Sequence, residues 1–189
     1  MKNFIMVFIL FLSSPKVWAL SIDANLFYFS DSIESTSSNA FTDTFYDVAV
    51  TINLDKRGRF FTGWSYGSLT SDRGDSGIAS ITITDMGPVF GWHMNRDNNW
   101  VLVAVYNLIS TADFTEASSG TSEEWRGSSY KVSVGYKGYV VEEMFQAGLY
   151  LNYYGSTFSE SVSNSTTLSN VSYSKSSIYP SILLSYRFE

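Results

Sequence analysis

Apolar and polar residues alternate one by one in eight segments of the chain. Residues 44–54 show this most clearly, because Tyr46 and Val48 alternate with Asp47 and Ala49. A period of two is typical of a β-strand with one apolar and one polar face. The expected strands cover residues 20–30, 44–54, 59–69, 85–94, 100–109, 128–138, 143–154 and 178–188.

The connections between these segments alternate between short and long. Short connections lie near residues 55–58, 95–99 and 139–142. Long connections, rich in Ser, Thr, Gly and Asp, lie at about 31–43, 70–80, 110–127 and 155–176. A transmembrane β-barrel has short periplasmic turns and long extracellular loops. A soluble β-sandwich or a lipocalin-like barrel with an aromatic core stays open as the alternative, because alternation alone does not separate them.

The distribution of aromatic residues favours a barrel in lipid. They make up 17% of the chain and fall near the strand ends on the apolar face, as in interfacial girdles. In hydrocarbon every backbone group needs a partner within the protein, so strands must close into a ring. The narrow bore of eight strands favours glycine inside and bulky rings outside. The sequence therefore predicts an all-β fold, an eight-stranded antiparallel up-and-down transmembrane β-barrel.

Two segments depart from the simple pattern. Residues 81–84 alternate in the opposite phase to residues 85–94, which suggests a bulge or a part of the strand that stands above the membrane. Residues 100–109 are apolar on both faces apart from Asn107. For this strand the outward face is predicted to carry Trp100, Leu102, Ala104, Tyr106 and Leu108.

The N-terminus has the features of a cleaved secretory signal. Lys2 precedes an apolar stretch at residues 4–12, and small residues precede the expected cleavage after Ala19. Nine apolar residues are too few for a transmembrane helix. We therefore expect a signal peptide at residues 1–19 and a barrel at residues 20–189.

Composition narrows the chemistry. The chain has no cysteine, which excludes disulfides, thiolate catalysis and a lipid anchor on cysteine. Its formal net charge of −6 argues against binding of nucleic acid. No phosphate-binding loop and no metal-ligand cluster is recognisable, so no cofactor is expected.

The C-terminal segment 182–188 has apolar residues at every second position and ends in Phe188, followed by Glu189. It is similar to the C-terminal assembly signal of outer-membrane barrels. Residues 20–189 resemble the small outer-membrane barrel superfamily typified by the transmembrane domain of outer-membrane protein A, without its peptidoglycan-binding domain. The resemblance implies location in the bacterial outer membrane, contact with its lipid, and recognition of Tyr186 and Phe188 by the barrel-assembly machinery.

Charged residues occur at inward positions of the expected strands. Buried charges persist only when they are paired or hydrated. A paired set would plug the lumen, and an unpaired set would line a narrow water path; the small bore favours the plug. The predicted lumen charge network consists of Asp23, Asp47, Arg59, Asp85, Lys131, Lys137 and Arg187.

His93 is the one histidine of the chain and is predicted at the periplasmic end of its strand. Lipid A-modifying barrels of similar size use a histidine with a serine and an acid near the extracellular leaflet, where the hydroxyl is activated. His93 is at the other end, so we expect no enzyme. The sequence favours a structural or surface-interaction protein, with a small porin-like channel and, less favoured, a lipid-modifying enzyme as alternatives.

Small outward residues suggest a face for self-association. The first, seventh and eighth strands become neighbours when the ring closes, and they carry Ala24, Ala147 and Pro180 among larger residues. Association of barrels in lipid depends on close packing, which small residues allow. A homo-oligomer through this face is therefore a hypothesis, beside the reading of these positions as ordinary lipid-facing residues.

Overall fold

The computed structural model describes residues 19–33, 39–73, 79–116, 122–141, 144–163 and 166–188. Together they form eight strands: β1 (Leu20–Ile33), β2 (Asn39–Asn53), β3 (Phe60–Arg73), β4 (Ala79–His93), β5 (Trp100–Glu116), β6 (Ser122–Val141), β7 (Phe145–Ser163) and β8 (Thr166–Phe188). The expected signal peptide lies outside the described residues, apart from Ala19. Within the described residues there is no helix of sufficient length and apolar character to cross a membrane.

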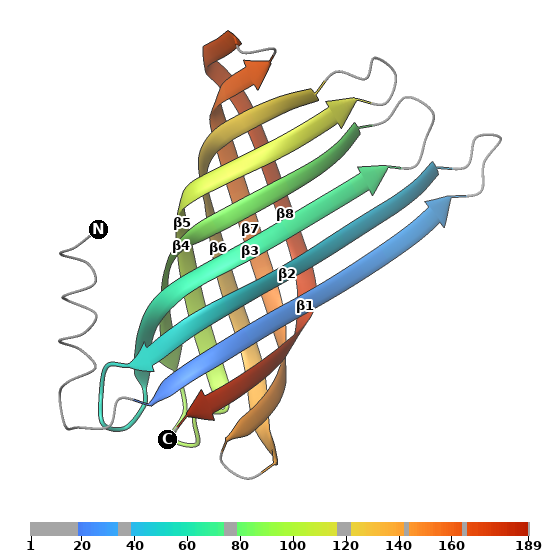
Figure 1. Ribbon diagram of the computed structural model, residues 1–189. Coiled ribbons are helices and arrows are strands. Elements are labelled where there is room, and N and C mark those ends of the chain that lie inside the picture. The colour runs from blue at the N-terminus through green and yellow to red at the C-terminus, as the bar shows by residue number, and fades with distance from the viewer. Residues whose placement is uncertain are drawn as a thin grey trace.

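Each strand pairs antiparallel with its neighbours in sequence, and the order β1 to β8 closes into a barrel (Figure 1). The ring closes where β1 pairs with β8, from Leu20 opposite Phe188 to Leu26 opposite Ile182. The predicted fold class is confirmed. The alternation of polar and apolar residues was sufficient for it because each strand keeps one face on each side of the wall.

Side chains alternate between the two sides of the wall as predicted. Along β6, Val132 and Val134 are exposed on the outside, while Lys131 and Ser133 are buried inside. The outward face of β5 is also confirmed, since Trp100, Leu102, Ala104, Tyr106 and Leu108 are all exposed. Val101, Val103 and Val105 on its other face pack in the lumen, whereas Ile109 is exposed because the β5–β6 register shifts between Asn107 and Ser110.

The strands are longer than predicted at the extracellular end. The connections expected at 110–127 and 155–176 are wrong in extent, because β5 continues to Glu116, β6 begins at Ser122 and β8 begins at Thr166. Pairing continues through this region, for example between Ser156 and Lys175. Above the membrane the outer face meets water, so the apolar signal disappears while the backbone ladder persists.

The phase change at residues 81–84 does not come from a change in the side of the wall to which the side chains point. Ile83 is fully buried on the same inner side of β4 as Asp85, because the lumen itself is apolar at this height. The expected irregularity does occur close by: the β4–β5 register shifts between Met86 and Val89. The alternation of side chains along β4 is thus continuous on the inside.

Candidate functional site: the barrel lumen

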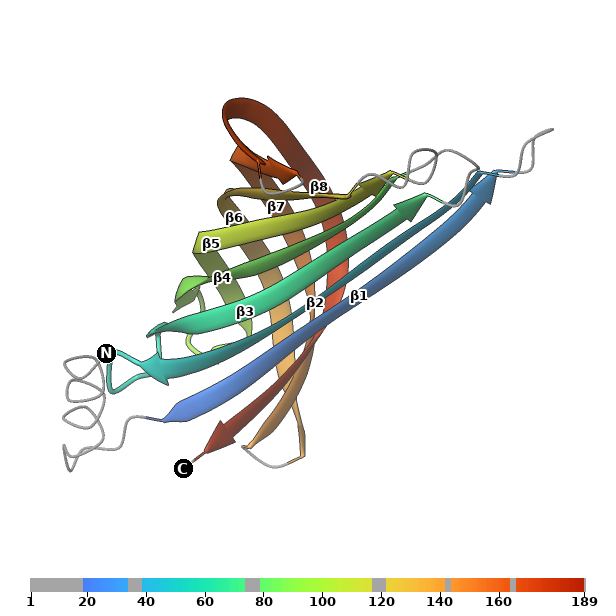
Figure 2. The same ribbon diagram turned by 45° about the horizontal axis from the view of Figure 1, so that its top comes forward.

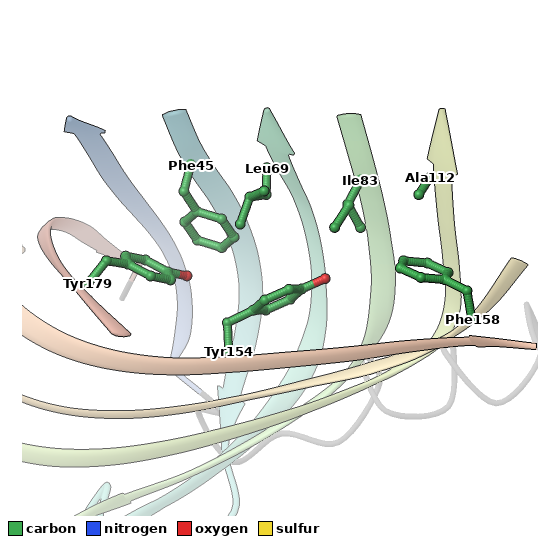
Figure 3. Packing of buried hydrophobic residues seen from close by; sticks show 7 residues of the cluster. All are labelled: Phe45, Leu69, Ile83, Ala112, Tyr154, Phe158 and Tyr179. Carbon is green, nitrogen blue, oxygen red and sulfur yellow. The ribbon is translucent and has the colours of Figure 1, made fainter. Parts of the chain in front are cut away.

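Side chains fill the lumen in three layers, which follow one another along β2, β3, β4, β5, β7 and β8. The upper layer is apolar and comes from six strands: Phe45, Leu69, Ile83, Ala112, Tyr154, Phe158 and Tyr179 (Figure 3). The lower layer is also apolar: Ala49, Phe61, Val89, Val101, Val105, Tyr150 and Leu183. Between them lies a polar layer, as the order Phe45, Asp47, Ala49 along β2 illustrates.

A buried ion pair lies at the centre of the polar layer. Nζ of Lys131, on β6, contacts Oδ2 of Asp47, on β2, and the two residues are 5% and 4% exposed. The other carboxylate oxygen of Asp47 accepts a hydrogen bond of 2.9 Å from Nδ2 of Asn25. The pair therefore connects β1, β2 and β6 across the bore.

Asp85 is held in the same layer by neutral groups. Its carboxylate accepts a hydrogen bond from the Ser129 hydroxyl at 2.8 Å and from the Tyr154 hydroxyl at 2.7 Å. Nδ2 of Asn107 donates to the oxygen of Ser129 at 2.8 Å. Among the described residues no ion pair involves Asp85, so hydroxyl groups stabilise its carboxylate in place of a cation.

Asn152 forms a third polar group on the β7–β8 side. Its Oδ1 accepts from the Ser133 hydroxyl at 2.7 Å. Its Nδ2 donates to the Tyr179 carbonyl at 3.1 Å and to the Ser181 hydroxyl at 2.9 Å. The predicted network included only the charged residues of this layer, although its amides and hydroxyls also occupy inward positions.

The structure brings only part of the predicted charge set together. Asp47 and Lys131 are paired, and Asp85 lies in the same layer. Asp23, Lys137, Arg59 and Arg187 lie nearer the periplasmic end, and no ion pair between described residues includes them.

These lower charges differ in their surroundings. Lys137 is buried, and Oδ1 of Asp23 is buried without a hydrogen-bond partner among the described residues. Arg59 lies just before β3, where its carbonyl accepts the backbone N–H of His93 at 2.7 Å.

His93 has a structural environment at the end of β4. Its Nδ1 lies 2.6 Å from the carbonyl oxygen of Gly58, and its ring packs against Phe61 with centroids 5.1 Å apart. Within the described ranges no group of three His, Asp or Glu side chains is placed to hold a metal ion. This end of the lumen is therefore a packed turn region.

The remaining predicted residues lie on the outer surface. Tyr186 and Phe188 are exposed, with ring centroids 4.8 Å apart in an edge-to-face arrangement. Ala24 and Ala147 lie on either side of Leu184, one on β1 and one on β7. Pro180 is exposed on β8 and lies opposite Leu151.

The distribution of side chains defines the class of protein. A ring of apolar side chains is exposed on the outside of the wall, while charged and amide side chains are buried within it. A water-soluble barrel has the reverse arrangement. A closed ladder with an apolar outside and a polar interior is that of an outer-membrane-type β-barrel.

No protein-family model and no curated protein matches the sequence. Among solved structures, the chain is similar to Neisserial surface protein A, with 12% identity over 90% of this chain and 97% of the other and a TM-score of 0.46. It is also similar to the translocator domain of the autotransporter NalP from Neisseria meningitidis, with 8% identity over 96% of this chain and 67% of the other and a TM-score of 0.46. The trimer form of OmpT, an outer membrane protein of Vibrio cholerae, has 14% identity over 92% of this chain and 53% of its own, with a TM-score of 0.33.

Proposed function

We propose that the protein is an integral outer-membrane barrel with a structural or surface-interaction role, and that its lumen is closed to ions. The Asp47–Lys131 pair carries this proposal, because it lies between two apolar layers that fill the bore above and below it. An ion that crosses would have to pass both layers. Moving an ion out of water into such an environment is costly unless a partner compensates it.

The extracellular extension of β5–β8 supports the surface role. We use this name for residues 110–116, 122–128, 156–163 and 166–177. Trp125 is stacked between Phe114 and Tyr173, with ring centroids 4.8 and 4.3 Å away. Its Nε1 donates to Glu123 at 2.9 Å, and the Ser161 hydroxyl donates to the same carboxylate oxygen at 3.0 Å. These contacts hold the base of the loops, where binding residues of barrels are concentrated.

A narrow channel is the second candidate, and one observation favours it. Two small cavities interrupt the polar layer, and both are lined by Asp47, Ser65 and Lys131. The polar side chains on the walls of these cavities give a water molecule hydrogen-bond partners. Lys131 lines both cavities, so a shift of its side chain would change the space in each.

Conductance in planar lipid bilayers tests the closed lumen. We expect the folded wild-type protein to give no steady channels, because two apolar layers close the bore. Phe45→Ala and Phe61→Ala, which thin the upper and the lower layer, should be needed together to open a path. Large steady wild-type channels would contradict the closed lumen and favour the channel. Comparison of lipid A from cells with and without the protein tests the absence of enzymatic activity, which we propose as well.

A further inference from the structure

The contact between β1 and β8 is shorter than the contacts these strands make on their other sides. β1 pairs with β8 only as far as Leu26 and Ile182, although its pairing with β2 continues to Ile33 and the β7–β8 ladder reaches Thr166. Both views show the two strands meeting near the C-terminus and diverging toward the extracellular end (Figures 1 and 2). Within the described residues, 27–33 of β1 and 176–181 of β8 each have one free edge.

The sequence of β8 explains where the ladder stops. Arg187 donates its backbone N–H to the carbonyl of Met144, on the β7 side. Residues of an antiparallel strand bond alternately to one neighbour and to the other, and the β7–β8 register is unshifted from Tyr186 to Tyr173. Even-numbered residues of β8 therefore direct their backbone groups toward β1.

Pro180 is one of these residues, and it has no N–H to donate. If the register continued, Pro180 would lie opposite Tyr28, directly beyond the last observed rung between Leu26 and Ile182. Proline is otherwise found on edge strands with its nitrogen turned away from a partner. Pro180 thus marks the point at which β8 becomes an edge strand.

The free edges begin inside the membrane. A transmembrane β-strand needs about 9–11 residues, and a span of this length counted from Phe188 ends near Ile178. The first missing rung, with Tyr28 opposite Pro180, therefore lies in the outer half of the hydrocarbon. Backbone groups at that depth need partners from a protein, because lipid tails have neither donors nor acceptors.

We propose that the free edge of β1 pairs with the free edge of β8 from a second copy of this chain. The two edges run in opposite directions, so copies inserted with the same orientation bring β1 and the other β8 together antiparallel. A twofold axis along the membrane normal forms both contacts at once. A soluble peptide does not reach the depth of Tyr28, whereas a second barrel is already there. The proposal depends on the chain crossing the membrane and is independent of whether the lumen conducts.

The outward side chains beside the opening fit such a contact. Tyr28 and Ile178 are 70% and 69% exposed, which makes them two of the most exposed apolar residues of the barrel. Ala24 lies just below them on β1, and small residues let the backbones of two barrels approach. Pairing at this edge would cover these side chains together with the backbone. The face predicted from Ala24 and Pro180 would then be the border of a shared ladder.

Cysteine cross-linking tests the proposal, since the natural chain has no cysteine. Ser30→Cys in a chain with one affinity tag and Ile178→Cys in a chain with another are co-expressed, and native membranes are oxidised. We expect a disulfide-linked heterodimer. Ser32→Cys with Ser176→Cys is the second pair, used if the first does not fold by heat-dependent gel mobility. Val48→Cys with Tyr106→Cys, on the outer faces of β2 and β5, should give no heterodimer.

A variant that supplies the backbone N–H missing at Pro180 can be compared with a matched control variant at another proline. Pro180→Ala in both chains should let each ladder continue within its own barrel, and the heterodimer should be lost. Pro88→Ala is the control, because its nitrogen faces β5 at the shifted register between Met86 and Val89. Three outcomes would overturn the proposal: folded chains without cross-links, a disulfide within one chain when both cysteines are placed in it, or a cross-link only to a protein of different mass.

Discussion

The membrane belt and the extracellular extension use the same backbone ladder but are stabilised by different side-chain contacts. The belt, the part of the strands that crosses the membrane, has a buried ion pair between apolar layers and an apolar outer face. In the extension the ion pair is exposed: Arg126 and Glu124 are 53% and 41% exposed, with Nε and Oε1 2.7 Å apart. Loss of an ion pair is therefore expected to have a large effect on stability in the belt, where the pair is buried, and a small effect in the extension, where it is exposed.

The largest contrast should come from breaking these two ion pairs. Lys131→Met leaves Asp47 buried without its cation and should cost about 3–5 kcal/mol in the free energy of unfolding. Arg126→Met breaks the exposed pair and should change the free energy of unfolding little. Urea unfolding in lipid vesicles measures both. Adding Asp47→Asn to Lys131→Met should recover part of the loss, and similar losses for the two single variants would contradict the contrast.

Charges introduced on the outer surface should give the next largest difference in stability between the two regions. Val50→Arg or Leu149→Arg places a cation against lipid and should cost about 2–4 kcal/mol if the residue is near the midplane. Thr157→Arg, at an exposed position of the extension, should cost little. The same unfolding experiment measures all three variants. Equal tolerance would mean that the strands are not inserted at the expected height.

The difference between the regions also explains what could be predicted from the sequence. In the belt, lipid on one side and a filled lumen on the other give each strand two distinct faces, so the number of strands and the outward face were predicted correctly. In the extension the outer face meets water, and strand β8 was expected to begin at residue 178 instead of at Thr166. Ser and Thr in that stretch suggested a loop although the backbone remains paired.

The lumen was predictable only in part. Inward positions follow from a period of two, which located Asp47, Asp85 and Lys131. Pairing across the bore depends on the angular position of each strand in the ring and on its height, and a one-dimensional pattern contains neither. The apolar layers were missed because Ile83 was taken as part of a change of phase instead of as an inward residue, and because the inward Val101 was not connected with apolar residues of other strands.

A weaker and more local effect should follow from loss of the aromatic stack. Trp125→Ala removes two stacked ring contacts, each worth about 0.5–1.5 kcal/mol beyond its buried area. We expect the extension to become sensitive to protease while the belt keeps its heat-dependent gel mobility. Trp100→Ala, which removes an exposed ring at the periplasmic end, is the control and should leave the extension resistant. Loss of heat-dependent mobility in Trp125→Ala would show that the two regions unfold together.

The smallest effect concerns the turn between β2 and β3, outside the membrane. The carboxylate of Asp55 accepts backbone N–H groups of Phe60 at 2.8 Å and of Arg57 at 3.2 Å. The hydrogen bond from Phe60 is the main cause that holds the pKa of Asp55 below its ordinary value of 3.8.

A lowered folded-state pKa stabilises the protein above the ordinary value, and this contribution disappears as the pH falls through the folded-state pKa. A backbone hydrogen bond contributes about 0.5–1.5 kcal/mol net, and exposure to water reduces the charged part. The wild-type protein should therefore lose slightly more stability between pH 6 and about pH 3 than Asp55→Asn, which keeps an acceptor oxygen but does not titrate. Urea unfolding at the two pH values measures the difference. Identical losses would mean that the turn contributes nothing to the acid sensitivity of the barrel.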